Sequence, residues 1–555
     1  MKVTFSLNSI FSKGMIFALA AGFAVAACGG EKLIHDGETL VFLGDSITHY
    51  GKIHRWGYVN LVVDGLAANG IRVNGIGAGI PGHKAWQMKA RFEKDVLANS
   101  PKVVTISAGV NDVWFQNADC TYDKFCVDME DMVKRAKEAG IRPVLMTPTT
   151  AFGEGDNAKI RQYAEGVREI AKRQDVPVAD TWKAVREQID NPETPKLTDF
   201  RDLKATVDGV HMAPAGDRVM AREVLRTLGL DAAEMAKAEA VWNTDTNLCG
   251  LSSDIGISLA DYQFLEAGAD KQGMKIEALY REVFRRGVVS VLKDPSPEKG
   301  EPTKIDELKP DDEKGEVAII GDYHYFCEKS NKSGLLRLVR AAIGVTGKDL
   351  RVFNEQNERG GTAGLNAYWD TKLAGRKIRY LVVFTGSYDA WANNRAEFPE
   401  MMKTLADKAV KAGAKVVFLT TRPTRSDVAK PFNEALRQMD NGDTVRVVDH
   451  SAIIAAELER RASNKNASCT SSGYPLNANV NFLTASAVLP CLGFTPEETA
   501  KAVASWKAMP DFATLAAETS VSFAEYDQLL QIAKKEGVPL SVIVDRALSR
   551  GVRMH

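Results

Sequence analysis

The chain has 555 residues, of which 45% are hydrophobic and 26% are charged, and its formal net charge is −1. This length suits roughly three to four domains, and the composition is that of a folded protein. A near-neutral charge balance gives no field that would attract nucleic acid or an anionic membrane surface, so neither is expected as a charge-driven partner.

The first 28 residues have the pattern of a signal peptide. Lys2 and Lys13 precede the apolar run Met15–Ala27, whose 13 residues are too few to span a bilayer. The run ends in small residues before Cys28, as in the processing box of a bacterial lipoprotein, where Cys28 would carry the lipid. Cleavage by ordinary signal peptidase, which would leave Cys28 as a stray thiol, is the alternative. Both interpretations predict export, and we expect a cell-envelope lipoprotein, periplasmic or on the cell surface, held to the membrane only by its lipid.

The next segment, residues 34–235, alternates short apolar runs with helical patterns. Strands are predicted at residues 39–44, 72–77, 103–109 and 142–148, and helices at 56–70, 128–140 and 159–174. This alternation predicts an α/β domain with a parallel sheet covered by helices on both faces. Ligands of such sheets bind beyond the carboxyl ends of the strands. Ser46, Gly79 and Asn111 each follow a predicted strand, so we expect them to converge at that edge.

Four fragments of this domain carry the residue types that ester cleavage needs. Ser46 in "GDSIT" could be a nucleophile, if a base takes its proton. Asp208 and His211 in "TVDGVH" are three positions apart, so one local turn can present both to the same pocket. Gly79 and Asn111 could donate a backbone and a side-chain N–H to an oxyanion. Taken singly, each has a plainer explanation: a helix-capping serine, a structural histidine, a loop glycine and a turn asparagine.

Together, the fragments resemble the SGNH (GDSL) hydrolase superfamily over residues 38–230, with "GVNDVW" and "DGVHMAPAG" especially close. The resemblance implies a three-layer, flavodoxin-like domain in which Ser46 is the nucleophile, His211 the base and Asp208 the residue that orients it. It implies Ser46, Gly79 and Asn111 as oxyanion donors, and neither a metal nor an organic cofactor. The asparagine that often precedes the block glycine by two residues is replaced by Gly77. An alternative register would start from Asn74 and make Gly77 the donor.

A second copy of this domain is predicted at residues 316–510, after a charged linker at residues 291–315. Gly321 follows Gly44 by 277 positions, and Trp391 follows Trp114 by the same interval. The nucleophile position is Tyr323 and the asparagine position is Tyr388, while Leu492 aligns with His211. Because these residues cannot replace serine and imidazole, the copy is expected to keep the fold without hydrolase activity.

Each large domain is followed by a small strand–helix–helix module, at residues 250–290 and 518–555. The two repeat at an interval of 264, with Tyr262 matching Tyr526 and Gly287 matching Gly551. They resemble ribbon–helix–helix modules, which pair through their strands, and we expect them to pair within the chain. The DNA binding that this resemblance suggests is disfavoured by export, near-neutral charge and the apolar strand residues, so no nucleic-acid partner is expected.

Six cysteines follow Cys28, and an even number in an exported chain suggests disulfides. Cys120 and Cys126 are the favoured pair because they are close enough to staple one loop. The spacings suit no metal site, so we expect no zinc.

The sequence therefore predicts an exported serine esterase that hydrolyses short acyl esters, acetyl esters first, through an acyl-Ser46 intermediate. Acylated carbohydrates are the first substrate expected. The alternatives are a lipase-like or lysophospholipase activity, and a non-catalytic cell-surface binding or scaffold protein.

Overall fold

The computed structural model describes residues 32–114, 120–150, 154–190, 208–297, 316–321, 334–353, 361–384, 396–421, 429–469 and 477–555. They belong to two compact units. The first comprises Met1–His49, Val62–Ala184 and Val219–Glu239, and the second comprises Tyr50–Leu61, Val185–Arg218 and Ala240–His555. The predicted signal peptide with Cys28, most of the charged linker, Tyr323 and Tyr388 lie outside the described residues.

The first unit contains a parallel sheet with the described strand order β2-β1-β3-β4-β5, which is the flavodoxin-like order. Its strands are β1 (Thr39–Gly44), β2 (Asn74–Gly79), β3 (Val103–Ser107), β4 (Arg142–Met146) and β5 (Val178–Ala179). Strands β1, β3 and β4 are buried along almost their whole length, which explains their nearly continuous apolar sequences. Strand β2 begins and ends two residues later than predicted, so that Gly79 is its last residue.

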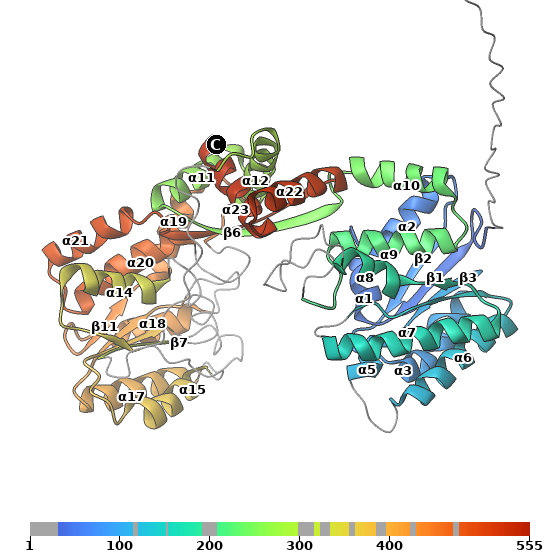
Figure 1. Ribbon diagram of the computed structural model, residues 1–555. Coiled ribbons are helices and arrows are strands. Elements are labelled where there is room, and N and C mark those ends of the chain that lie inside the picture. Colours follow the sequence, from blue (N-terminus) through green and yellow to red (C-terminus); the bar gives the residue numbers. More distant parts are fainter. Residues whose placement is uncertain are drawn as a thin grey trace, which may run out of the picture. The chain divides into compact units, whose positions relative to one another are not determined.

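Helices lie on both faces of this sheet. Figure 1 shows α6 and α7 on one face and α2 and α9 on the other. The helical elements of this part of the chain are α1 (Ser46–Ile53), α2 (Tyr58–Ala67), α3 (Ala85–Ala90), α4 (Phe92–Asp95), η1 (Leu97–Asn99), α5 (Val110–Trp114), α6 (Tyr122–Glu138), α7 (Glu154–Gln174), α8 (Thr181–Asp190), α9 (Pro214–Thr227) and α10 (Ala232–Thr244). The predicted α/β class with a parallel sheet is therefore confirmed.

The second unit contains another parallel sheet, β11-β10-β9-β7-β8, whose order read from β8 is again second, first, third, fourth, fifth. Its strands are β7 (Val317–Gly321), β8 (Val352–Phe353), β9 (Tyr380–Phe384), β10 (Lys415–Leu419) and β11 (Val445–Val448). Its helices are α14 (Leu335–Thr346), α15 (Gly361–Tyr368), the π-helical turn η3 (Trp369–Leu373), α17 (Phe398–Lys411), α18 (Lys430–Gln438), α19 (His450–Arg460), α20 (Ala478–Cys491) and α21 (Pro496–Lys507). Helices α15 and α17 cover one face and α14 and α20 the other (Figure 1).

The helices after β11 show that one sequence assignment is wrong. Helix α20 begins and ends 264 positions after α9, and α21 begins 264 positions after α10. Leu492 directly follows α20, as Leu228 directly follows α9. The backbone N–H of each leucine donates to the carbonyl four residues earlier, of Val488 and Val224 respectively. The helix bounds therefore place Leu492 in register with Leu228 and not with His211. The helical patterns of α21 and α9 are similar, and for this reason the sequence alone places Leu492 opposite His211.

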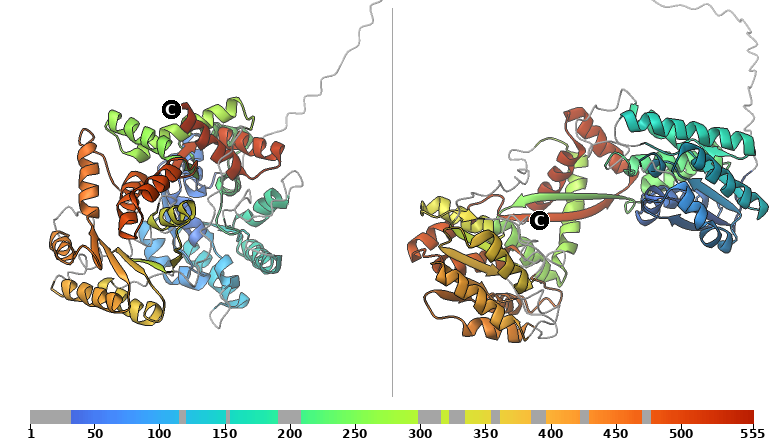
Figure 2. Two further views of the ribbon diagram at one scale, coloured as in Figure 1. Left: turned by 90° about the vertical axis from the view of Figure 1, so that its left-hand side faces the viewer. Right: turned by 90° about the horizontal axis from the view of Figure 1, so that it is seen from below.

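The two small modules lie together within the second unit. They consist of β6 (Cys249–Ile257), α11 (Leu259–Gln272) and α12 (Ile276–Lys293), and of β12 (Ala513–Val521), α22 (Phe523–Glu536) and α23 (Leu540–Met554). Strands β6 and β12 pair antiparallel, from Cys249 opposite Val521 to Ile257 opposite Ala513 (Figure 2, right). This register is symmetric about the pair Ser253–Ala517.

Two matched glycines let α12 and α23 cross in close contact. A Cβ on Gly287 would lie 1.7 Å from the Ala547 carbonyl oxygen, and one on Gly551 would lie 2.0 Å from that of Val283. Each first helix also has a serine cap, Ser258 or Ser522, that accepts a backbone N–H three residues on.

The outer face of the β6–β12 ribbon, the face opposite the helices, is polar and acidic. Its exposed residues are Ser252, Asp254, Ala516 and Glu518. Burial and the neighbouring Glu518 carboxylate raise the pKa of Asp254. A face of this charge would repel phosphate groups.

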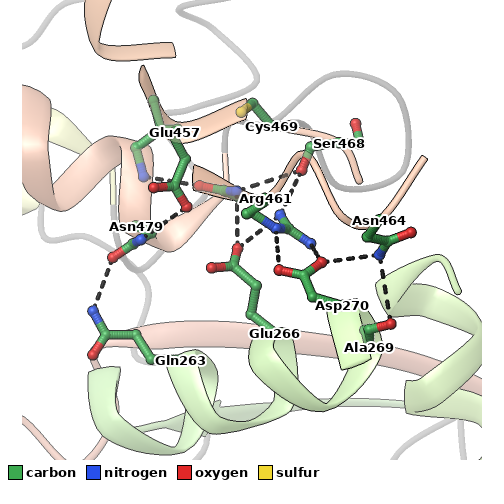
Figure 3. A network of polar contacts seen from close by, with 12 residues as sticks. Gln263, Glu266, Ala269, Asp270, Glu457, Arg461, Asn464, Ser468, Cys469 and Asn479 are labelled. Carbon is green, nitrogen blue, oxygen red and sulfur yellow. Dashed lines mark hydrogen bonds and ion pairs between the residues drawn. The ribbon is translucent and has the colours of Figure 1, made fainter. Parts of the chain in front are cut away.

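A buried polar network joins α11 to the end of α19 and the turn that follows it (Figure 3). The Arg461 side chain is 2% exposed and donates to both carboxylate oxygens of Asp270 at 2.8 Å and to Glu266 at 2.9 Å. Burial raises the pKa of Glu266 to about 7, although Arg461 and Arg460 oppose that shift. The module is thus held to the second α/β domain by ion pairs removed from water.

Cys120 and Cys126 are both free thiols, so the predicted disulfide between them is not formed. Cys126 lies in the first turns of α6, where its thiol hydrogen-bonds with the Tyr122 side chain, and Cys120 precedes the capping residue Thr121. Among the described helices, none is long and apolar enough to cross a membrane.

Candidate active site

Ser46 stands at the turn between the first strand and the first helix. It is the first residue of α1 and is half-buried. The preceding Asp45 caps the helix, because its carboxylate accepts the Ile47 N–H at 2.9 Å. Gly44 leaves no room for a side chain, since a Cβ there would lie 2.0 Å from the Thr48 hydroxyl oxygen. The turn therefore fixes the serine at the positive end of a helix dipole.

Gly79 lies beside this turn, at the end of β2 and opposite Gly44 in the sheet register. A Cβ on Gly79 would lie 2.2 Å from the His49 backbone nitrogen and 2.7 Å from the Asp45 carbonyl oxygen. Only glycine allows this approach of the two backbones. Gly77, the alternative donor, pairs with Phe42 within the strand and is two residues farther from that end.

Asn111 follows β3 and reaches the same turn from the other side of β1. Its buried side-chain amide donates to the Asp45 carboxylate and to the His83 carbonyl, each at 3.2 Å. The next residue, Asp112, accepts the Ala85 N–H at 3.1 Å. Burial, with the nearby Asp45 carboxylate, raises the pKa of Asp112 to about 6. These contacts bring Asn111 to the turn that carries Ser46.

Asp208 and His211 lie in the second unit, directly before α9. The Asp208 carboxylate is 2.6 Å from His211 Nδ1 and also accepts the backbone N–H groups of Val210 and His211 at 3.0 and 2.8 Å. Burial acts to raise the pKa of Asp208, but these bonds from His211 and Val210 outweigh it and hold the pKa below its ordinary value. The carboxylate thus stays charged and fixes the imidazole so that Nε2 is the nitrogen left for chemistry.

The imidazole of His211 packs edge-to-face with the Tyr50 ring, with centroids 4.9 Å apart. Tyr50 follows Ser46 by four positions on α1, so both side chains leave the same face of that helix. The sequence analysis gives Tyr50 no role, and the signal that could have found it is its spacing of four residues from Ser46.

Arg91 is a second residue that sequence reasoning missed. Its guanidinium donates to the carbonyls of Gly44 at 2.7 Å and Ala78 at 2.9 Å, and it pairs with Asp95. One side chain therefore ties together the ends of β1 and β2, where Ser46 and Gly79 lie. No local pattern marks it, because its acceptors are distant backbone groups. Among the described residues, no group of three or more His, Cys, Asp or Glu side chains could hold a metal ion.

Residues 42–219 match the GDSL-like lipase/acylhydrolase family. An acetylxylan esterase of Geobacillus stearothermophilus is 32% identical over 222 residues, an alignment that covers 97% of that protein and 36% of this chain. The chain belongs to the GDSL-like lipase/acylhydrolase family. As a member of this family it is a carboxylic ester hydrolase.

Two further comparisons concern the same part of this GDSL-like chain. An uncharacterized lipoprotein, YqeF, of Bacillus subtilis (strain 168) is 26% identical over 233 residues, covering 90% of YqeF and 36% of this chain. The crystal structure of Axe2, an acetylxylan esterase from Geobacillus stearothermophilus, aligns with 30% identity and a TM-score of 0.32, covering 97% of that chain and 36% of this one.

Proposed function

We propose that this GDSL-like protein is an exported serine esterase that removes acetyl groups from carbohydrate esters through an acyl-Ser46 intermediate. The observation that carries the proposal is the Asp208–His211 pair, in which the carboxylate lies 2.6 Å from Nδ1. The imidazole packs against Tyr50, which lies one turn after Ser46 on the helix that Ser46 begins. The acetylxylan esterase relative supports the choice of an acetyl ester on a carbohydrate.

In this mechanism His211 Nε2 takes the proton of the Ser46 hydroxyl as its oxygen attacks the ester carbonyl carbon. The tetrahedral oxyanion accepts N–H groups from the Ser46 backbone, the Gly79 backbone and the Asn111 amide. The two present bonds of that amide are long, at 3.2 Å, so one can be exchanged for the oxyanion at small cost.

Collapse of this intermediate breaks the ester bond, and His211 returns the proton to the departing alcohol. Water then attacks the acyl-Ser46 carbonyl while His211 takes its proton, and acetate leaves with the Ser46 hydroxyl restored. Asp208 remains charged throughout and stabilises the imidazolium that forms twice in each cycle.

The second α/β domain is, in this proposal, a silent copy of the first, with domains at residues 34–235 and 316–510. A repeated polar arrangement supports common descent. Asp180 accepts the Thr147 hydroxyl and the Arg168 guanidinium, and its counterpart Asp449 accepts those of Thr420 and Arg437. The interval of 264 assigns Ser472 and Pro475 to the positions of Asp208 and His211, so this copy has neither base nor orienting carboxylate.

The small modules, residues 250–290 and 518–555, are proposed as a ribbon–helix–helix pair formed inside one chain. The symmetric register of β6 with β12 and the reciprocal glycine contacts of α12 and α23 support this. Export with lipid attachment at Cys28 is proposed from the leader pattern, and the lipoprotein relative in Bacillus subtilis supports it.

The decisive experiment compares the full chain, without its leader, with Ser46→Ala and Tyr323→Phe on p-nitrophenyl acetate and acetylated xylo-oligosaccharides. Loss of the nucleophile should lower kcat by at least about a thousandfold, whereas Tyr323→Phe should leave it unchanged. Release of acetate from the oligosaccharide identifies the substrate class. Preference for long-chain esters would favour a lipase, and a Ser46→Ala variant as active as the parent would end the esterase proposal.

A further inference from the structure

A row of aromatic rings in contact runs from His211 to the ribbon of the paired modules. Tyr50 contacts His211 at 4.9 Å, and its other neighbour is His54, stacked at 5.5 Å with the planes 17° apart. His54 in turn stacks on Trp56 at 4.5 Å and 21°. The row His211–Tyr50–His54–Trp56, called the aromatic ladder here, lies entirely within the second unit.

The far end of the ladder rests on strand β6. A Cβ on Gly250 would lie 2.5 Å from Trp56 Cζ3 and 3.0 Å from its Cη2, so the indole is in contact with the bare strand backbone. Gly250 belongs to the outer face of the ribbon, on the same side as Ser252 and Asp254. Trp56 thus occupies one end of the outer face of the ribbon, the face opposite the module helices.

The loop that carries Tyr50, His54 and Trp56 is fixed by contacts of its own backbone. The Asn60 amide donates to the carbonyls of Lys52 and His54, both at 2.8 Å. A Cβ on Gly57 would lie 2.2 Å from the Gly51 carbonyl oxygen, so the two ends of the loop touch. Such a closed loop transmits a displacement of Trp56 to Tyr50 instead of absorbing it.

Two ion pairs join the same parts of the chain beside the ladder. Arg218, seven residues after His211, makes a bidentate pair with Asp527 of α22 at 2.8 Å and lies over the Phe523 ring at 4.5 Å. Arg55 pairs with Asp245, just before β6, at 3.1 Å. The second module therefore contacts the helix that follows His211, and the loop that carries the ladder is tied to the turn that leads into β6.

We propose that the paired modules are a positioning support of the esterase site, which hold His211 in its productive orientation through the aromatic ladder. The proposal rests on the assignment of His211 as the catalytic base. Asp208 holds one edge of the imidazole through Nδ1, and the Tyr50 ring packs against the imidazole edge-to-face and restricts its rotation about that bond. Through His54, the contact of Trp56 with Gly250 keeps Tyr50 in place. Tyr50, His54 and Trp56 are thus positioning residues.

The remote end of the ladder provides the first test. Gly250→Val should displace Trp56 and lower kcat on p-nitrophenyl acetate about tenfold, since a misplacement of about 1 Å can cost up to about a hundredfold. KM should stay within about twofold, because the change does not reach the substrate. Ser252→Val, on the same face of the same strand but exposed, is the matched control and should leave kcat unchanged. Equal kcat values for the two variants would overturn the proposal.

The near end provides a second test that does not depend on how well Gly250→Val folds. Tyr50→Leu should lower kcat about tenfold at unchanged melting temperature, and Tyr50→Phe, which keeps the ring, should restore most of that loss. A purely structural role of Tyr50 would lower the melting temperature and the active fraction without changing kcat per active site, measured by acyl-enzyme burst, and would contradict the inference. If Ser46→Ala is inactive while Tyr50→Leu is fully active, only this inference fails; if Ser46→Ala is active, the esterase assignment itself fails.

Discussion

Asp112 shows how a single residue beside the nucleophile turn affects stability. Its carboxyl group is 1% exposed, and burial raises its pKa from 3.8 to about 6. Between these values the native state binds more protons than the unfolded chain, so the free energy of unfolding falls as the pH rises. Above about pH 6 the full penalty remains, on the order of 3 kcal/mol for two pKa units.

Asp112→Asn should remove this penalty while keeping an oxygen that accepts the Ala85 N–H. We expect the variant to melt at a higher temperature than the parent at pH 7.5, and the difference to vanish near pH 4. Calorimetry across this range is the measurement. A difference that does not change with pH would show that the charge of Asp112 carries no such cost.

At the same scale, the sequence marks Ser46, Asp208, His211, Gly79 and Asn111 as candidate site residues because each stands in a short local motif. Arg91 and Tyr50 escaped notice for different physical reasons. The acceptors of Arg91 are carbonyls 47 and 13 positions away, which only the folded sheet brings together. The role of Tyr50 depends on the ring of His211, 161 positions later, and helical spacing alone could show only that Tyr50 shares a face with Ser46.

At the scale of elements, a glycine-to-alanine substitution should change the free energy of unfolding in opposite directions at two sites. One site is the crossing of α12 and α23, and the other is an open position in α14. Gly287→Ala would place a methyl group 1.7 Å from the Ala547 carbonyl oxygen, and we expect it to lower the free energy of unfolding by about 1–3 kcal/mol. Gly344→Ala in α14 meets no atom within 4 Å and should raise it by about 0.5–1 kcal/mol, because alanine favours helix. Denaturant unfolding of both variants measures the contrast, and equal signs would refute the close crossing.

Two adjacent arginines at the end of α19 give a second contrast. Arg461→Met removes the buried guanidinium that pairs with Asp270 and with one carboxylate oxygen of Glu266, which should cost about 3–5 kcal/mol. Arg460 is 52% exposed, so Arg460→Met should cost no more than about 1 kcal/mol although it contacts Glu266 and Glu457. Thermal unfolding of the full chain distinguishes them, and a similar loss for both would mean that burial does not decide the effect.

Helices and strands were largely predictable from the sequence where it shows a regular hydrophobic pattern or repeats a segment at a fixed interval. The strand–helix alternation gave the parallel sheet, and the 264-residue interval identified the modules as a pair. The interval between matched positions is 277 up to Trp391 but 264 from α20 onward, which in the proposed duplication corresponds to a deletion between them. Helical periodicity cannot locate such a change of interval, and for this reason the sequence alone places Leu492 opposite His211.

For the whole molecule, the net charge and the acidic outer face of the ribbon predict that the protein does not bind nucleic acid. The net charge is −1, the outer ribbon face carries Asp254 and Glu518, and one end of it contacts Trp56. The full chain should pass through a heparin column at moderate salt without retention. The double substitution Asp254→Lys/Glu518→Lys serves as the positive control, since it gives that face the charge that would retain it. Retention of the parent protein would contradict this prediction.

The pairing of β6 with β12 inside one polypeptide has an evolutionary consequence. In a homodimer every mutation occurs twice, so neither half can specialise without the other. In the proposed duplication, joining the halves on one gene removes that restriction: the nucleophile position of one half can be tyrosine, and one end of the ribbon can contact a tryptophan, while the other half keeps its own residues. Two separate, identical subunits could not maintain such an asymmetry.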